Sequence, residues 1–404
     1  MKSLVIAQSG GPTAAINATL TGIVERALTC GEVDKIYGAR YGVKGLIKNE
    51  LVEIGEILSN PDSLNRLIHT PSASLGSCRV KLGAPEKCPA DYEAMFNSLS
   101  SCGAKWFICI GGNDSMDTVA KLSDYSKAKG LDISIMGAPK TVDNDLCGMD
   151  HSPGFGSAAK YIATTFSELW CDCRVYDIPA VTIVEVMGRH VGWLTASAAM
   201  SKEGSPAPQL IYMPEIPFDN ARFIKDIKAE LEKNPAVLIA VSEGIRYENG
   251  SFVGEASQSG ITDIFGHKYL TGAARVLEEL ICAEVGCKAR SIVLSLMQRC
   301  AGHLASSNDL TEARLLGATA FDRALKGHSG EVAVINRISD DPYRVSYSAI
   351  SANEIANKER AIPRKWINER GNGVTDEMIC YLKPLIYGGF GSEIRNGLPV
   401  HIEF

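Results

Sequence analysis

The chain has 404 residues, of which 45% are hydrophobic and 22% are charged, and its formal net charge is -6. This composition is typical of a folded globular protein, and the length predicts two or three domains of roughly 100–200 residues each. The acidic balance excludes a general basic field for nucleic acid or anionic lipid, so a polyanionic ligand must be met by local positive groups.

Twelve cysteines are scattered along the chain, and the closest pair, Cys171 and Cys173, has no second pair nearby to complete a metal site. Their spacing is not that of a small disulfide scaffold, and no secretory leader precedes them. No apolar run approaches the about 20 residues needed to cross a bilayer. We therefore expect a cytoplasmic protein with reduced cysteines and no membrane partner.

Apolar runs alternate with amphipathic segments from the start of the chain. The buried strands predicted in this way cover residues 3–8, 106–110, 133–139, 180–188 and 236–244. Helical spacing of apolar residues follows the first strand, and a second helix is predicted to start near Ser115 and to stop at Gly130. Apolar strands separated by helices predict an α/β fold of mainly parallel sheets with helices on both faces.

Two segments are candidate domain boundaries. Residues 139–157 form a loop rich in Gly, Pro and Asp, and residues near 300–310 lead into a further helix. The tail, residues 381–404, carries aromatic and aliphatic side chains that predict packing rather than disorder.

Glycine pairs follow two of the predicted strands. Gly10-Gly11 and Gly111-Gly112 offer backbone N–H groups at strand–helix junctions, where phosphates bind. One such turn is equally well explained as an ordinary connection, but two suggest one long phosphate-bearing ligand or two separate ones. The second turn also carries a carboxylate, Asp114, where an anion would be expected to lie.

Residues 139–146, PKTVDNDL, place a cluster of charged groups just past another strand. Asp143, Asn144 and Asp145 could simply cap a solvated turn. Alternatively, one carboxylate takes a proton while the other helps to hold Mg²⁺, which binds one or two carboxylates together with phosphate oxygens. Lys140 would then neutralise charge on a transferring phosphoryl group.

Three more charged residues come after apolar strands, and each is ambiguous alone. Arg189 follows residues 180–188, Glu243 follows the strand that begins at Ala236, and Arg299 follows the run SIVLSLM. Each could reach solvent along its stem. Because ligands bind beyond the carboxyl ends of parallel strands, we expect these groups to share one cleft with Lys140 and the glycine turns. Such a cleft is suited to phosphoryl transfer to a hydroxyl.

The ordered series SGG, GGNDS, PKTVDND, EVMGRHVG, SEG and QR resembles the phosphofructokinase family over about residues 3–325. The resemblance implies two Rossmann-like three-layer αβα domains with largely parallel sheets and an active site in the cleft between them. The larger, donor-binding domain would comprise residues 1–150 and about 305–375. The smaller, sugar-phosphate-binding domain would comprise about 151–304 and the tail 376–404.

Carried over position by position, the resemblance implies roles for these residues. The catalytic residues are Asp143, Lys140, Asp114 and Arg189. Asp143, the first Asp of the T-x-D-N-D signature, is the general base that deprotonates the 1-hydroxyl of fructose 6-phosphate. The donor-binding residues are Gly10, Gly11, Arg79, Gly112 and Lys140. The substrate-binding residues are Thr141, Val142, Asp143, Met187, Gly188, Arg189, Glu243 and Arg299. The ligands of Mg²⁺ are Asn113, where many members carry Asp, and Asp145.

The identity of the phosphoryl donor follows from two positions. ATP-dependent members usually have Gly at the places of Asp114 and Lys140, whereas pyrophosphate-dependent members have Asp and Lys. A carboxylate at 114 would repel the α-phosphate of ATP, and pyrophosphate ends before that point. Lys140 can supply the charge stabilisation that the nucleotide otherwise brings. We therefore expect a reversible, Mg²⁺-dependent phosphotransfer from pyrophosphate to fructose 6-phosphate.

Two departures from the family pattern concern the 6-phosphate site. Ala180 stands where the allosteric bacterial enzymes have an arginine that reaches a neighbouring subunit, and residues 300–308 differ from their G-G-S-P run. His190 and His303 are candidate replacements, although a lone histidine is more often structural. We expect a homodimer or homotetramer that binds small-molecule substrates and no nucleic acid.

Three alternatives stay open. An ATP-dependent phosphofructokinase could tolerate Asp114, and a comparison of rates with the two donors would distinguish it. A non-catalytic regulatory subunit would bind sugar phosphates without turnover, although intact Asp143, Asp145 and Arg189 argue against it. Lipid and NAD kinases share a GGD-type loop but lack the M-G-R and T-x-D-N-D pair.

Overall fold

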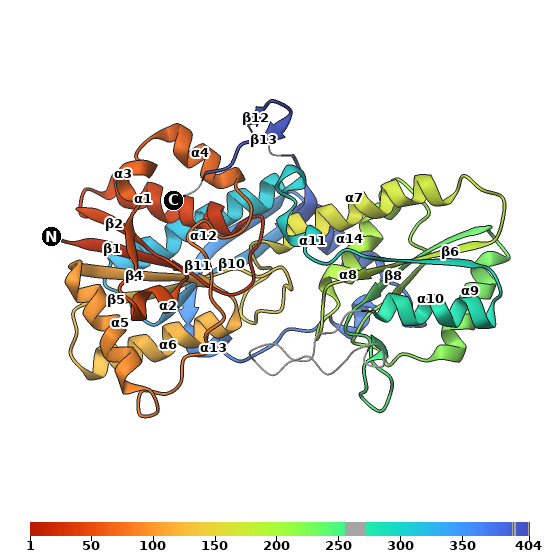
Figure 1. The fold of residues 1–404 in the computed structure, drawn as a ribbon, viewed down its shortest axis with the longest axis horizontal. Helices are drawn as coiled ribbons and strands as arrows, with labels where there is room; N and C mark the ends of the chain where they lie inside the picture. The colour runs from red at the N-terminus through yellow and green to blue at the C-terminus, as the bar shows by residue number, and fades with distance from the viewer. Residues whose placement is uncertain (255–271, 390, 392, 403) are drawn as a thin grey trace.

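The computed structural model describes residues 1–254, 272–389, 391, 393–402 and 404. It has two lobes, each built around one sheet, and they lie side by side in Figure 1. The larger lobe contains a seven-stranded sheet of order β11-β10-β5-β4-β1-β2-β3. Its strands are β1 (Ser3–Gln8), β2 (Lys35–Ala39), β3 (Leu51–Glu53), β4 (Ala104–Gly111), β5 (Ser134–Pro139), β10 (Glu331–Asp340) and β11 (Tyr343–Ser351).

The five inner strands of this sheet run parallel, and the edge strands β3 and β11 are antiparallel to their neighbours. Helices cover both faces of the sheet, which explains why β1 is buried along its whole length. One face carries α1 (Ile16–Cys30), α3 (Gly55–Leu58), α4 (Pro61–His69) and α12 (Ser307–Leu325). The other carries α2 (Val43–Ile47), α5 (Pro89–Ser101), α6 (Asn113–Ala128) and α13 (Ala352–Ile355).

The smaller lobe contains a four-stranded parallel sheet of order β7-β8-β6-β9. Its strands are β6 (Ala180–Val186), β7 (Leu210–Tyr212), β8 (Ala236–Ser242) and β9 (Lys288–Val293). Side chains of β6 alternate between two cores: Val184 and Val186 pack in one, and Val181 and Ile183 in the other. The first core includes residues of α7 (Phe155–Cys173), α8 (Trp193–Ser197), η1 (Ala198–Glu203) and α14 (Asp376–Leu382), whereas the second includes residues of α9 (Asn220–Leu231) and α10 (Ala273–Glu284).

Short helical turns lie in the connecting segments. They are α11 (Met297–Cys300), η3 (Gly302–Leu304), η4 (Arg364–Trp366) and η5 (Lys383–Ile386). The chain ends beyond a small hairpin of β12 (Ile394–Arg395) and β13 (Leu398–Pro399), which projects above the larger lobe in Figure 1.

The predicted α/β fold with mainly parallel sheets is confirmed, and all five predicted strands are present within two residues of their expected ends. The second helix differs: α6 begins at Asn113, two residues before Ser115. Asp114 therefore lies in the first turn, where the helix dipole favours a carboxylate. None of the helices in the described ranges is long and apolar enough to span a bilayer.

The C-terminal tail packs, as expected, but it divides between the lobes. Met378 and Leu385 belong to a core of the smaller lobe, whereas Ile402 and Phe404 pack against the core of the larger lobe. Ile362 and Ile367 also pack in the smaller lobe. The segment from α13 to η4 therefore carries the chain from one lobe to the other before residue 375. The predicted assignment of residues 305–375 to the larger domain and 376–404 to the smaller domain stays a prediction.

Candidate active site

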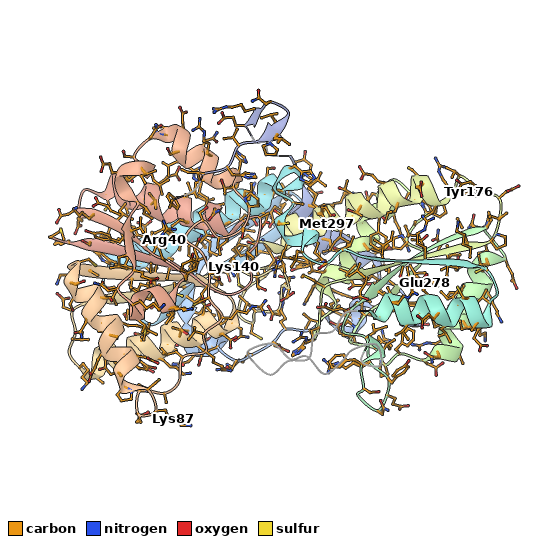
Figure 2. The ribbon with its side chains drawn as sticks, in the orientation of Figure 1. Arg40, Lys87, Lys140, Tyr176, Glu278 and Met297 are labelled. Carbon is orange, nitrogen blue, oxygen red and sulfur yellow. The ribbon has the colours of Figure 1, made fainter. Side chains whose placement is uncertain are left out.

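The predicted polar signatures lie at the carboxyl ends of parallel strands in both lobes. The glycine turns follow β1 and β4, Lys140 follows β5, and the M-G-R and S-E-G segments follow β6 and β8. Figure 2 labels Lys140 on the side of the larger lobe that faces the smaller lobe. This placement brings residues that are far apart in the sequence to one region, as expected for open α/β sheets.

The first glycine turn lies between two cationic side chains. Gly10 has φ +76°, a conformation in which a side chain is strained. A Cβ atom built on Gly10 would lie 3.5 Å from Lys140 Nζ, and one built on Gly11 would lie 3.7 Å from Arg299 Nη1. Both glycines thus leave room for a ligand group beside a positive charge. Helix α1 begins only at Ile16, so the turn stands apart from the helix end.

Lys140 is buried, with 1% of its side chain exposed, and it holds the first glycine turn. Its Nζ donates to the carbonyl of Ser9 at 2.9 Å and to that of Gly11 at 2.7 Å. Burial lowers the pKa of Lys140 to about 8, although the carboxylates of Asp143 and Asp145 oppose this shift. The ammonium group is therefore a buried positive charge beside the turn.

Asp143 and Asp145 flank a buried turn residue, Asn144. The N–H of Asp143 donates to Thr141 Oγ1 at 3.1 Å, and Asn144 has φ +56°. The Asn144 amide is bonded on both sides, to the Tyr381 hydroxyl at 2.9 Å and to the N–H of Ser152 at 3.0 Å. The turn is therefore held from several directions.

The environment of both carboxyl groups disfavours negative charge. Burial raises the pKa of Asp143, and burial together with the neighbouring Asp143 raises that of Asp145 to about 7. Within the described part of the chain, Asp145 Oδ1 is buried and has no hydrogen-bond partner. A cation placed between these groups would satisfy that oxygen and favour the ionised forms, so the residues fit a divalent metal.

The described ranges contain no group of three or more His, Cys, Asp or Glu side chains arranged to hold a metal ion. Mg²⁺ usually binds through one or two carboxylates and completes its shell with phosphate oxygens and water. Such a site needs no three-residue cluster. The other predicted ligand, Asn113, has its amide engaged elsewhere: Oδ1 accepts from the N–H of Asn357 at 2.5 Å, and Nδ2 donates to the carbonyl of Lys358 at 2.6 Å.

The smaller lobe contributes the M-G-R and S-E-G segments, which touch each other. Gly188 has φ +139°, and a Cβ there would lie 2.6 Å from the carbonyl of Val191. Its N–H donates to Glu243 Oε1 at 3.3 Å. Burial raises the pKa of Glu243 to about 7, and Asp143 contributes to this rise. Arg189 Nε is buried and unpaired among the described residues. Glu243 and Asp143 are therefore near enough to interact across the lobes.

Arg299 lies in the short helix α11 rather than directly at a strand end. Burial and the nearby Arg79 lower its pKa, and Asp143 opposes this shift. The structure thus gathers most of the charged residues singled out in the sequence. They are Arg79, Lys140, Asp143, Asp145, Arg189, Glu243 and Arg299.

Three of the predicted positions have other surroundings. Asp114 is about half exposed and lies 3.6 Å from the exposed Lys81. Val142 packs in a core of the smaller lobe with 8% exposure. The N–H of Met187 donates to Gln298 Oε1 at 3.2 Å. Their parts in ligand binding stay predictions.

Sequence reasoning missed the residues that back this site. Glu359 Oε1 lies 2.9 Å from His190 Nδ1, within hydrogen-bonding distance, and Arg360 contacts the 144–150 turn. Tyr381 contacts the same turn from α14. No local motif marks these residues, because their contacts join segments more than 160 residues apart.

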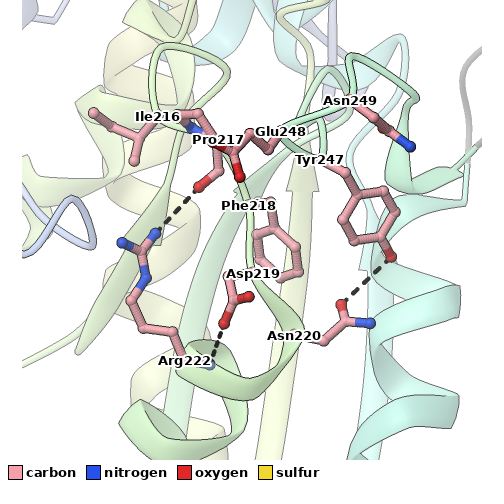
Figure 3. Close-up of a pocket in the computed structure, with 9 residues that line it drawn as sticks. All are labelled: Ile216, Pro217, Phe218, Asp219, Asn220, Arg222, Tyr247, Glu248 and Asn249. Carbon is pink, nitrogen blue, oxygen red and sulfur yellow. Dashed lines mark hydrogen bonds between the residues drawn. The ribbon is translucent and has the colours of Figure 1, made fainter.

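A separate hollow of about 700 Å³ lies on the smaller lobe (Figure 3). It is lined by residues 216–220 and Arg222, around the start of α9, and by residues 247–249. Arg222 and Asp219 take part in hydrogen bonds of its own wall. The hollow contains none of the residues predicted for the active site.

Comparison with known proteins gives consistent matches. The model of the family described as phosphofructokinase matches residues 3–324. The chain is 38% identical to a pyrophosphate–fructose 6-phosphate 1-phosphotransferase of Halomonas elongata, covering 97% of this chain and 94% of the relative. Identity is also 38% with the protein of that name from Xanthomonas campestris pv. campestris, covering 99% and 96%. The crystal structure of a pyrophosphate-dependent phosphofructokinase from Marinobacter aquaeolei superposes with a TM-score of 0.88 at 34% identity, covering 99% of this chain and 95% of that one.

Proposed function

The chain belongs to the phosphofructokinase family, and from that premise we propose that it transfers a phosphoryl group from pyrophosphate to the 1-hydroxyl of D-fructose 6-phosphate. The products are fructose 1,6-bisphosphate and phosphate. Relatives that bear the name of this transferase align over nearly their whole length. The observation that carries the assignment of the donor is the buried Lys140 ammonium beside the glycine turn.

The reaction needs a base for the 1-hydroxyl and positive charge around the transferring group. Asp143 accepts the hydroxyl proton while the hydroxyl oxygen attacks the distal phosphorus of pyrophosphate, and the bond from that phosphorus to the bridging oxygen breaks. Lys140 stabilises the charge that develops on the equatorial oxygens. Proximity of Lys140 and Arg299 to Asp143 supports these roles, since each favours the ionised base.

Different sets of residues bind the two substrates on either side of the transferring phosphoryl group. On the sugar side, Glu243 accepts hydrogen bonds from hydroxyl groups, and Arg189 and Arg299 bind the phosphate of fructose 6-phosphate. Arg189 Nε is buried and has no hydrogen-bond partner in the described part of the chain, which supports a ligand at this place, because a buried guanidinium nitrogen is normally satisfied. On the donor side, Arg79 and the Gly10-Gly11 turn bind pyrophosphate.

The choice of pyrophosphate over ATP rests on Asp114 together with Lys140. Asp114 is half exposed at the start of α6, so its carboxylate would repel a third phosphate that extended along this loop. Pyrophosphate is short enough to avoid it. The control of donor choice by these two side chains stays part of the proposal.

Kinetics with both donors test this function directly. We expect the purified protein to use pyrophosphate at least about 100-fold more efficiently than ATP, a difference of about 3 kcal/mol. The double variant Asp114→Gly, Lys140→Gly should lose most pyrophosphate activity. A matched control, Lys105→Gly with Asp132→Gly, removes an exposed Lys–Asp pair from the same lobe and should keep it. Undiminished pyrophosphate use by the first variant would refute the donor argument.

Mg²⁺ is the proposed cofactor. Asp145 would hold it together with phosphate oxygens, and the bound ion would neutralise charge on the transferring group. The buried Asp145 Oδ1, which has no partner among the residues that the structure describes, supports this role. Titration calorimetry of Mg²⁺ in the presence of pyrophosphate should give binding that Asp145→Asn weakens by tenfold or more, as an order of magnitude expected for losing a ligand.

We also propose a homo-oligomer located in the cytoplasm. Strand β9 is an edge strand of the smaller sheet, and Leu296 and Met297 beyond it are more than half exposed. Tyr176, labelled at the far end of the smaller lobe in Figure 2, is 67% exposed. Such apolar surface is typical of subunit contacts. All twelve cysteines are free thiols, which suits a reducing compartment. Light scattering would test the oligomeric state, and cell fractionation would test the location.

A further inference from the structure

The segment Asn357–Arg360 connects the lobes and touches three loops of the candidate active site. Asn357 and Lys358 pair through their backbone with the Asn113 amide at the start of α6. Glu359 lies 2.9 Å from His190, which follows Arg189 in the smaller lobe. Leu146 and Glu359 form an isolated antiparallel bridge. The segment therefore packs alongside the 143–150 turn.

Arg360 makes the largest number of these contacts. Its N–H donates to the carbonyl of Asp145 at 2.7 Å. Its guanidinium donates to the carbonyl of Asn144 at 3.2 Å, to that of Met149 at 3.0 Å and to that of Asp150. One side chain thus joins both ends of the turn that presents Asp143 and Asp145.

The other side of Arg360 faces the smaller lobe. Its guanidinium carbon lies 4.6 Å from the centre of the Trp193 ring, within cation–π range. The Trp193 indole N–H donates to the Arg360 carbonyl at 2.9 Å. Trp193 is 1% exposed and begins α8, four residues after Arg189. Arg360 therefore links the turn in one lobe to the start of a core helix in the other.

The middle residue of this turn has a left-handed backbone conformation. Asn144 has φ +56°, in a region that few non-glycine residues adopt and that asparagine tolerates. Tyr381 binds the Asn144 side chain, and Arg360 binds its carbonyl. The conformation of Asn144 sets the directions of the two residues on either side of it.

We propose that Arg360 is a positioning residue for the phosphoryl transfer, which holds Asp143 at the reacting groups through the backbone of the 144–150 turn. This inference rests on the proposed function. Arg360 acts through Asp143 and makes no contact with substrate in the reaction. A planar guanidinium can serve several carbonyls at fixed angles, whereas a lysine ammonium offers its donors from a single atom.

The chain offers a matched control for this arginine. Arg364 also binds three backbone carbonyls, those of Ile367 at 2.9 Å, Asn368 at 3.1 Å and Glu369 at 3.4 Å. These carbonyls belong to a loop of the smaller lobe that carries no predicted site residue. Arg360→Lys and Arg364→Lys therefore make the same chemical change at two arginines that each bind backbone carbonyls, and only Arg360 binds the 144–150 turn.

The test is a double-mutant cycle with the full chain. We expect Arg360→Lys to lower kcat with pyrophosphate about 10- to 100-fold, because small displacements of a catalytic group have effects of this size. Calorimetry should give an unchanged number of fructose 6-phosphate sites per chain and a Kd within about threefold of the wild-type value, whereas Arg364→Lys should leave kcat within about twofold. In an Asp143→Asn background, Arg360→Lys should lower the residual kcat by less than about threefold, because a residue that acts through Asp143 loses its effect without it.

Two results would overturn the inference. Equal losses of kcat in the wild-type and Asp143→Asn backgrounds would give Arg360 only a general structural role. A kcat of Arg360→Lys that equals the wild-type value would show that the turn needs no guanidinium. Failure of the proposed function itself is distinguishable, because the wild-type chain would then show no pyrophosphate-dependent product in the same assay.

Discussion

Replacement of Lys140 by Met should remove activity and change the pH dependence of stability in a calculable way. Lys140 is almost completely buried, and its Nζ binds two carbonyls of the first glycine turn. Methionine has a similar length and no charge. If Lys140 stabilises the transferring group, kcat with pyrophosphate should fall by about 10²–10³, the usual effect of losing one such donor.

The stability effect follows from the depressed pKa. Burial lowers the pKa of Lys140 from 10.5 to about 8 in the folded chain, so below pH 8 the buried charge costs about 3 kcal/mol of folding free energy. Against this, the variant leaves the carbonyls of Ser9 and Gly11 unpaired, at about 1–3 kcal/mol each. At pH 7 these effects oppose each other, and the net change is therefore a weak test.

The pH slope separates them. Between about pH 8 and pH 10.5 the unfolded state binds more protons at this residue than the folded state does, so wild-type stability gains from rising pH. Relative to Lys140→Met, the wild-type free energy of unfolding should rise by about 2 kcal/mol from pH 7 to pH 9.5. Urea unfolding of both proteins at a series of pH values measures this, with Lys105→Met as the control for loss of an exposed lysine. Parallel curves for wild type and Lys140→Met would refute the reasoning.

Three further predictions concern the base, the sugar site and a buried ion network. Asp143→Asn should lower kcat by about 10²–10⁴ while calorimetry still detects fructose 6-phosphate binding, and a smaller loss would mean that another group takes the proton. Wild-type affinity for fructose 6-phosphate should weaken as pH falls through about 7, where the Glu243 carboxylate is protonated, and Glu243→Gln should abolish this pH dependence. An unchanged pH profile in the variant would show that Glu243 does not bind the sugar. His151 is buried between Asp150 and Glu312; burial opposes its charge, but these two hydrogen bonds outweigh burial and raise its pKa to about 9. Its stabilising contribution is therefore complete below about pH 6.5 and lost as pH rises through about 9, so His151→Gln should cost about 3–5 kcal/mol at pH 6 and less at pH 9.5, as urea unfolding can check; a constant cost would contradict the charged ring.

The smaller lobe illustrates what local sequence can predict. Residues 180–186 and 236–242 are mainly apolar, interrupted only by Thr182, Glu185 and Ser242, and each is a largely buried parallel strand in the structure. Arg189 and Glu243 come just after these strands, and the two segments meet through Gly188. Their proximity was predictable because parallel neighbours end at the same edge of a sheet.

The Asn113 side chain illustrates what local sequence could not predict. The family resemblance implied that Asn113 is a metal ligand, and in the structure its amide binds the backbone of Asn357 and Lys358. The metal role of Asn113 stays a prediction. Arg360 likewise gave no signal in the sequence. Its contact with Asn144 joins residues 216 positions apart, and nothing in either segment alone indicates the other.

The sequence by itself determined the α/β class, the order of the strand-end signatures, the family resemblance and the Asp114–Lys140 pair on which the prediction of the donor rests. These features depend on residue type and short-range spacing, which are readable along the chain. The tertiary structure decided that Lys140 is buried with a pKa of about 8, that Asp145 Oδ1 has no hydrogen-bond partner among the described residues, and that Arg360 binds the 144–150 turn. Burial and long-range hydrogen bonds arise only when distant segments pack together, so they could not be derived from the spacing of residues alone.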